Sequence, residues 1–187
     1  LTPEQRELKM PTLGDENTVF AEKAEVGNQA IGKTTTNKPF VEVTTDILAG
    51  VPQTDWVKTV KTHLKNKFPN GIVVGKNEIK IDRQSRREIT NSKYTQGLRR
   101  KGNGIYEDKL RATDNADEII QATTGWVNEG LNHPRKDDIE DFSRGDVLLR
   151  IGNNDYAAKV VVGKRKNGEM MLYDLLSLKP TAFTAKE

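Results

Sequence analysis

The stretch that decides the fold lies near the C-terminal end, where residues 146–178 read DVLLRIGNNDYAAKVVVGKRKNGEMMLYDLLSL. Three runs in it, 146–151, 156–162 and 170–178, are rich in apolar and β-branched residues. The segments between them are 152–155 and a loop containing Asn167-Gly168, and Asn-Gly is a strong signal for a tight hairpin turn. The stretch therefore predicts an antiparallel meander of three strands.

The segments before the meander predict mostly helices. A helix is expected over 56–68, because Trp56, Val60 and Leu64 share one face, with Thr54 as its N-cap. The capping box Ser85-Arg86-Arg87-Glu88 predicts a second helix running to about residue 94. Glycines at 97, 102 and 104 should end it and leave 99–101 in a mobile basic loop. A further helical stretch is expected over 106–122, broken at 113 or 114.

Short strands are expected at 40–43, at 72–74 and 78–81 as a hairpin, and briefly at 125–127, with a long polar loop over 128–143. Helices first and a meander last favour an α+β fold, with N-terminal helices packed on one face of a twisted, mainly antiparallel sheet. The first 38 residues have few bulky apolar groups, so 1–38 is expected to be a weakly ordered leader or linker and 39–187 the folded domain. Because the chain begins at Leu1 without a signal-like segment, we expect it to be part of a larger chain.

Composition excludes several classes of protein. The chain has 187 residues, 34% hydrophobic and 30% charged, and no apolar run approaches the roughly 20 residues that a membrane-spanning helix needs. With no cysteine and two histidines, it cannot form disulfides or a cysteine-bound zinc site, and a multi-histidine metal centre is not expected. Dinucleotide-binding, Walker-type and serine-hydrolase motifs are missing as well, so we expect no cofactor and no metal.

The charges are unevenly distributed along the chain. Residues 76–111 carry eleven basic and five acidic side chains, a net charge of +6, and residues 112–146 carry a net charge of −6. A basic stripe followed by an acidic block is one footprint of a polyanionic partner. The alternative is that the two blocks are solvated faces that pair with each other. Nucleic acid is favoured only if the basic side chains converge.

The start of the helix at Ser85 is the sharpest local feature. Arg86 and Arg87 lie where the helix dipole is already positive, which is mildly unfavourable unless an anion binds there. A phosphate is one explanation, and a solvated face with Glu88 as neutralising neighbour is the other. Of the two histidines, His63 on the first helix is expected to be structural, whereas His133 in a loop could transfer a proton near neutral pH.

Over about residues 40–183 the chain resembles toxin nuclease domains of the barnase, EndoU, colicin and RelE group. The divergent form that it is similar to occurs in contact-dependent inhibition toxins and in phage polyvalent proteins. The likeness rests on the order of elements, on the basic helix beginning Ser85-Arg86-Arg87, and on the closing segments 173–175 (YDL) and 179–183 (KPTAF). The leader resembles the linker that joins such toxins to a long secreted filament.

This resemblance implies a metal-independent ribonuclease, acting on tRNA, in which a ribose 2′-OH attacks its own phosphate to give a 2′,3′-cyclic phosphate. The catalytic residues that the resemblance implies are Arg86, Arg87, Thr90, Lys93, Arg150, Tyr173 and Thr181, and the loop residue His133 is a further candidate for proton transfer. The basic residues Lys80, Arg83, Arg99, Arg100 and Lys101 are expected to bind the RNA. The general base stays open between Lys93 and His133, because the basic helix has no histidine where several relatives have one.

The same resemblance implies two protein partners and a place of action. A larger secreted parent chain would deliver the toxin into the cytoplasm of a target cell, and a cognate immunity protein with an acidic surface would cover its basic cleft. The alternative function is a non-catalytic accessory domain of a polyvalent protein that binds nucleic acid or protein. A deoxyribonuclease is a third and weaker alternative, since it should need a divalent cation and a carboxylate cluster that the sequence does not single out.

Overall fold

The computed structural model describes residues 31–33, 39–130, 138–181 and Phe183. The strands in this part of the chain are β1 (Ile31–Lys33), β2 (Pro39–Val43), β3 (Ile72–Val74), β4 (Asn77–Lys80), β5 (Thr124–Gly130), β6 (Ile139–Ile151), β7 (Asn154–Arg165) and β8 (Met170–Pro180). The helices are α3 (Trp56–Lys67), α4 (Arg83–Asn91), α5 (Lys93–Lys101), α6 (Ile105–Ala112) and α7 (Ala116–Ala122), with short 3-10 turns η1 (Gln53–Asp55) and η2 (Thr113–Asn115).

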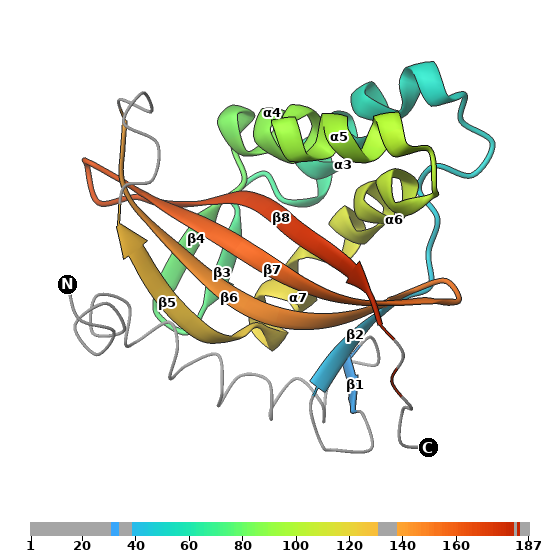
Figure 1. The fold of residues 1–187 in the computed structure, drawn as a ribbon. Helices are drawn as coiled ribbons and strands as arrows, with labels where there is room; N and C mark the ends of the chain where they lie inside the picture. Colours follow the sequence, from blue (N-terminus) through green and yellow to red (C-terminus); the bar gives the residue numbers. More distant parts are fainter. Residues whose placement is uncertain (1–30, 34–38, 131–137, 182, 184–187) are drawn as a thin grey trace.

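The predicted meander is confirmed as β6, β7 and β8, which pair antiparallel along most of their length (Figure 1). It is the centre of one sheet with the order β1-β2-β6-β7-β8-β4-β3, in which β5 also pairs with β6. The long strand β6 has room for two neighbours on its outer edge, β2 along 148–151 and β5 along 142–146. Only the β2–β6 and β4–β8 pairs are parallel among the described strands, so the sheet is mainly antiparallel, as predicted.

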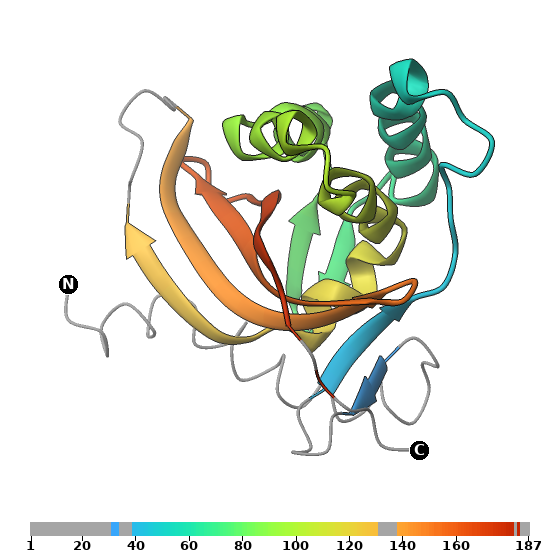
Figure 2. The same cartoon turned by 45° about the vertical axis from the view of Figure 1, so that its right-hand side comes forward.

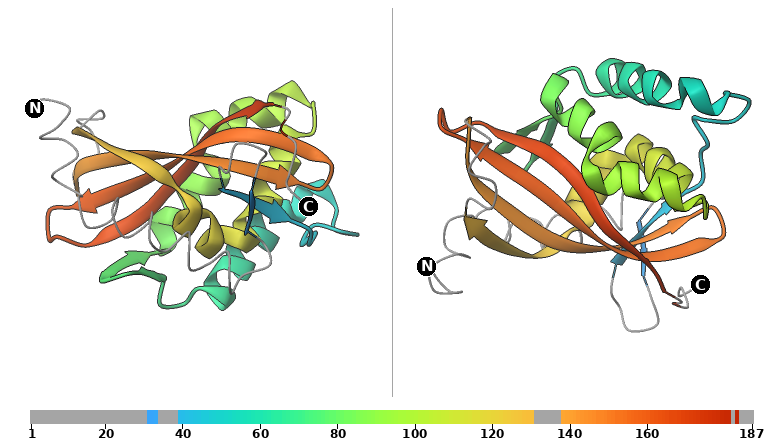
Figure 3. Two further views of the ribbon diagram at one scale, coloured as in Figure 1. Left: turned by 90° about the horizontal axis from the view of Figure 1, so that it is seen from below. Right: turned by 45° about the horizontal axis from the view of Figure 1, so that its top comes forward.

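The sheet curls, and the helices lie on one side of it (Figure 2). Both views in Figure 3 show the same two layers, from below and with the top turned forward. Alternate residues of β7, including Tyr156, Val160 and Val162, face the helices and join a core with Leu64 and Ile120. This arrangement confirms the predicted α+β architecture with helices on one face.

Two of the expected boundaries change, one in the expected leader and one in the expected loop over 128–143. Residues 31–33, which fall in the expected leader, form β1 and pair with β2, so this part of 1–38 belongs to the sheet. The rest of the expected leader lies outside the described residues. The polar loop expected over 128–143 is also wrong at both ends, because β5 continues to Gly130 and β6 begins at Ile139.

The helix expected from Ser85 is really two helices, and it begins earlier. Asp82 is the N-cap of α4, and its carboxylate accepts a hydrogen bond from the Ser85 amide. Ser92 ends α4 and caps α5, which continues through Gly97 and ends at Gly102 in the left-handed conformation, with φ of 62°. The basic loop expected over 99–101 is therefore wrong, because these residues form the last turn of α5.

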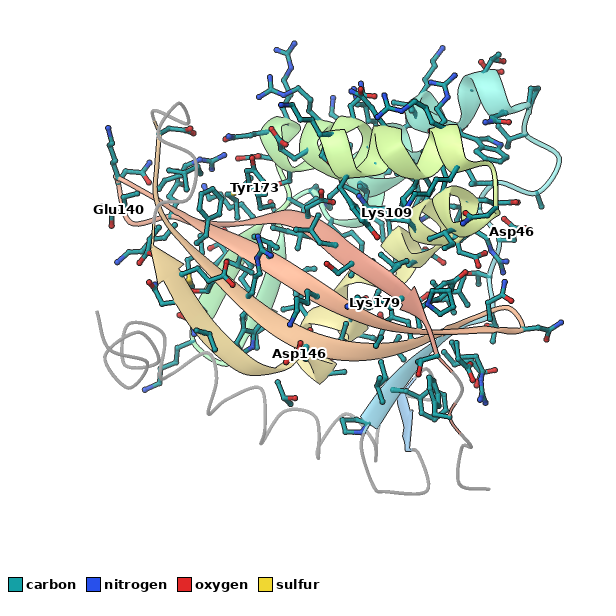
Figure 4. All side chains as sticks on the ribbon, in the orientation of Figure 1. Asp46, Lys109, Glu140, Asp146, Tyr173 and Lys179 are labelled. Carbon is teal, nitrogen blue, oxygen red and sulfur yellow. The ribbon has the colours of Figure 1, made fainter. Side chains whose placement is uncertain are left out.

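A buried ion pair connects the helical layer to the sheet. Lys109 of α6 lies 2.6 Å from Asp174 of β8, and their side chains are 0% and 1% exposed. Figure 4 labels Lys109 below α5, on the side toward the sheet. Lys109 also donates to the Ile89 carbonyl and to Thr95, and Ser92 donates to the other Asp174 oxygen at 2.8 Å. Burial lowers the pKa of Lys109 and raises that of Asp174, whereas their mutual attraction favours the charged forms.

We predict that Asp174→Asn lowers the free energy of unfolding by about 3–5 kcal/mol, because Lys109 is left buried beside an uncharged acceptor. Asp146→Asn is the control, since its exposed pair with Lys159 should contribute less than about 1 kcal/mol. Urea denaturation at pH 7 measures both. Equal losses in the two variants would contradict a special role for the buried pair.

Candidate nucleic-acid interface

Helix α3 carries a row of lysines beside its buried stripe. Val60 and Leu64 are fully buried against the core. Lys58, Lys61 and Lys65 follow at three- and four-residue spacing and so share one side of the helix. The sequence reasoning missed these lysines, although their spacing next to an apolar stripe was visible.

Helix α4 presents two further cations. Arg83 and Arg87 are four residues apart and both are exposed, so their side chains are neighbours on the outer side of the helix. The Asp82 carboxylate occupies the N-terminal end of the helix, where the sequence suggested a phosphate. The protein's own Asp82 carboxylate therefore takes the place of the anion expected at this helix end.

Arg86 and Thr90 are turned toward the protein. Arg86 donates to the Ile81 carbonyl at 3.2 Å, and Thr90 is 1% exposed, with its hydroxyl donating to the Arg86 carbonyl at 2.7 Å. A buried hydroxyl that already serves a backbone carbonyl is not available to a phosphate oxygen. In this structure the Thr90 hydroxyl is therefore occupied within α4.

Helix α5 extends the row of cations. Lys93, Arg99, Arg100 and Lys101 are all exposed, and the buried side of the helix is formed by Thr95 and Leu98. We call the set on α3, α4 and α5 the basic helical face: Lys58, Lys61, Lys65, Arg83, Arg87, Lys93, Arg99, Arg100 and Lys101. In Figure 4, many nitrogen-tipped side chains extend outward on this side of the molecule.

The three helices that carry the basic helical face contain a single acidic residue. Across α3, α4 and α5 the only carboxylate is that of Glu88, which is 9% exposed and lies on the inner side of α4. Within the part of the chain that the structure describes, none of the nine cations forms an ion pair. The positive potential of this face is therefore left for a partner in solution.

A groove of about 470 Å³ lies at one end of this face, between α3, β4 and α4. It brings together Lys65, Lys80, Arg83 and Arg86 with two acidic residues, Glu78 and Asp82. Lys80 forms an ion pair with Glu169, and this hydrogen bond raises the pKa of Lys80. Three of the expected RNA-binding or catalytic residues thus meet here, and Arg83 is the exposed one without a partner among the described residues.

Arg150 and Thr181, expected to be catalytic, lie together at another place. Arg150 binds both oxygens of Asp155, at 2.7 and 3.1 Å, and its guanidinium lies over the rings of Phe40 and Phe183. The hydrogen bond between Arg150 and Asp155 raises the pKa of Arg150 and lowers that of Asp155. Thr181 reaches the same corner by donating its amide to the Asp155 carbonyl.

Strand register separates this corner from α4. Lys80 at the end of β4 pairs with Met171, which is opposite Gly163, which is opposite Phe142 on β6. Arg150 is eight residues farther along β6 than Phe142. At about 3.3 Å per residue, it lies roughly 26 Å from Phe142 along the strand. Arg86 and Arg87 do not meet Arg150 at a common pocket.

The remaining expected catalytic residues are also dispersed. Tyr173 packs edge-on against Phe142, with ring centres 4.9 Å apart, and Figure 4 shows it well separated from Lys179 along β8. Lys93 is exposed at the start of α5. His133 lies outside the described residues.

One cluster that the sequence reasoning treated as structural combines several titratable groups. His63 Nε2 lies 2.7 Å from Asp114 Oδ1, and the same carboxylate accepts from Lys67 at 2.9 Å and from Thr45 at 2.5 Å. Burial acts to raise the pKa of Asp114, but these three hydrogen bonds outweigh it and lower the pKa to about 2. Asp114 therefore stays charged and holds the imidazole in a fixed orientation.

Among the described residues, no three His, Asp or Glu side chains are arranged to hold a metal ion. None of the helices in this part of the chain is long and apolar enough to cross a membrane. The fold and its interface define an α+β domain with a cationic, unpaired helical face.

Residues 53–173 match the family described as large polyvalent protein-associated domain 3, and the chain belongs to this family. The matched range runs from η1 into β8 and includes the whole basic helical face. No curated protein and no solved structure matches the chain. The family description names an association with large polyvalent proteins and no catalytic activity, so membership of the toxin nuclease group stays a prediction.

The carboxyl groups of Asp117 and Glu118 on α7 follow Asp114 of the His63 cluster by three and four residues, and they make the stability of the fold depend on pH. Burial and a hydrogen bond with Glu118 raise the pKa of Asp117 to about 7. An acid that holds its proton more tightly when folded loses stabilising effect as the pH rises from its unfolded value, about 3.9, through its folded value. We expect the free energy of unfolding to fall between about pH 4 and about pH 7, and less steeply in Asp117→Asn. Denaturant titrations at both pH values measure this, with Glu140→Gln as control. A slope unchanged by Asp117→Asn would contradict the assignment.

Proposed function

We propose that this domain is a nucleic-acid-binding accessory module of a larger polyvalent protein. The observation that carries the proposal is the basic helical face, with nine cations that form no ion pair among the described residues. Phosphate backbones are the polyanions that such a face fits, because lysine and arginine side chains gain affinity by releasing the counterions of the nucleic acid.

Several cations on the sheet form ion pairs with acids, unlike the cations of the basic helical face, and this difference supports the proposal. Lys159 pairs with Asp146, Lys164 with Glu140, and Arg144 with Glu129. These three strand cations are thus paired with acids, whereas the nine cations of the basic helical face form no ion pair among the described residues. Such a contrast is expected if the helices meet a partner that supplies the negative charge.

Metal-independent cleavage of RNA, with tRNA as substrate, is the second candidate. One observation favours it: His63 is oriented by Asp114, an arrangement that suits a general base, and Lys67 lies beside it. An acidic immunity protein, secretion with a parent chain and action in a target cell are predictions that belong to this candidate. An acidic immunity protein would also be the natural competitor for the basic helical face.

A double variant of α4 tests binding. Replacing Arg83 and Arg87 together by Ala should weaken binding of a fluorescent tRNA, and the slope of log affinity against log salt should shrink by about 1.4–1.8. The control is the double variant Lys159→Ala with Lys164→Ala, which loses the same charge from paired positions on the sheet. Fluorescence anisotropy between 50 and 300 mM salt, on the order of the range used for such slopes, measures both. Equal effects in the two variants would mean that net charge alone governs binding.

An assay of tRNA integrity separates binding from cleavage. With EDTA present, tRNA incubated with the whole chain should stay intact on a denaturing gel while it binds in the anisotropy assay. If cleavage appears with the wild type and disappears in His63→Gln, which keeps a polar side chain at this position, the ribonuclease candidate replaces the binding module. Folding of the variant would be checked by its urea transition.

A further inference from the structure

We propose that the ligand of the basic helical face is double-helical nucleic acid, bound through its sugar-phosphate strands without reading of the bases. This inference rests on the proposed function and narrows it to one class of ligand. Two observations support it: the face carries nine cations on helices, and no aromatic ring is exposed on it among the described residues.

Single-stranded nucleic acid is usually held by bases that stack on aromatic side chains. In the described part of the chain, Val73 is the only exposed large hydrophobic side chain, so no aromatic ring is exposed there. The aromatic residues of the helical layer are engaged internally. Trp56 packs on Tyr106 and donates its indole N–H to the Val51 carbonyl, and the Tyr94 hydroxyl accepts from the Leu178 amide.

The face also offers few groups that could read base edges. Asparagine and glutamine amides are the usual readers of adenine. The exposed amides on these helices are Asn66, Asn91 and Gln96, and the Gln96 amide already donates to the Asn91 carbonyl across the junction of α4 and α5. The remaining exposed positions are mostly Lys and Arg, whose hydrogen bonds to nucleic acid go largely to phosphate oxygens.

The spacing of the cations suits a regular array of phosphates. Helices α4 and α5 have nine residues each, so the row from Arg83 to Lys101 extends up to about 27 Å at 1.5 Å per residue. A duplex presents one phosphate for about every 1.7 Å of its axis, on two strands. Helix α3 packs against α4 and is steeply inclined to the direction of α4 and α5 (Figure 2), so its lysines extend the cationic surface in a second direction. A rigid cationic surface that extends in two directions fits the two strands that border a groove better than one flexible strand.

A binding titration compares duplexes with single strands. The full chain would be titrated with labelled 16-base-pair duplex RNA, duplex DNA of the same sequence, and each single strand, a length on the order of one double-stranded RNA site. We expect both duplexes, or one of them, to bind at least about tenfold more tightly than either single strand, a difference of about 1.4 kcal/mol. A duplex with a permuted sequence should bind within about twofold, as expected for contacts to phosphates.

The outcomes are distinguishable. Binding to none of the probes overturns the proposed function itself. Single strands that bind as tightly as duplexes, or a strong dependence on sequence, overturn this inference and leave the proposed function standing. Tight binding of RNA duplex alone or of DNA duplex alone supports the inference and identifies the source of the phosphates.

A variant of α3 tests directly whether the lysines of this helix contact the duplex. Replacing Lys58, Lys61 and Lys65 together by Ala keeps strong helix formers in α3 and should reduce the salt slope for duplex by about 2.7. The slope for a single strand should change by less than half as much. The double variant Lys159→Ala with Lys164→Ala, on the sheet, is again the control. An equal change for duplex and single strand would show that α3 does not contact a second strand.

Discussion

The ion pair between Lys109 and Asp174 is the contact on which the arrangement of the helical layer depends. Through Lys109, Ser92 and the Ile89 carbonyl, it joins α6, the α4–α5 junction and β8. A buried pair of this kind is tolerated only when its hydrogen bonds are satisfied, and here Asp174 also accepts from the Leu175 amide at 2.8 Å. The positions of α4 and α5 are therefore set from inside the molecule by charge as well as by apolar packing.

This internal connection explains how the outer sides of α4 and α5 can be so strongly basic. Ser92 accepts from the Thr95 amide, which starts α5, and donates to Asp174, so the junction of the two helices is held to β8. The cations on either side of Ser92 sit on helices whose spacing is fixed before any ligand arrives. Preorganised groups lose less conformational freedom on binding, which leaves more of the electrostatic attraction for affinity.

The sequence was sufficient for most of the fold and failed where two local signals compete. The three runs of apolar and β-branched residues and the turn at Asn167-Gly168 predicted the meander, because strand pairing there is between neighbours in the chain. The helix boundary was misplaced because Ser85-x-x-Glu88 fits a capping box, whereas Asp82 is the residue whose carboxylate takes the Ser85 amide. Gly97 suggested an end to α5, but a glycine inside a helix costs only about 1 kcal/mol, and Thr95 and Leu98 are buried around it.

The candidate site was only partly predictable, because a count of basic residues does not tell where each one points. Lys109 contributed to the basic stripe in sequence and is fully buried in the structure, and Arg150 is used by Asp155 across a neighbouring turn. By contrast, Lys58, Lys61 and Lys65 lie outside the stripe and are part of the face. What distinguishes α3, α4 and α5 is the lack of exposed carboxylates, since Glu88 is their only acid and is buried. A cation becomes part of a binding surface when the fold provides no acid to pair with it, and this condition, more than the number of lysines and arginines, locates the interface.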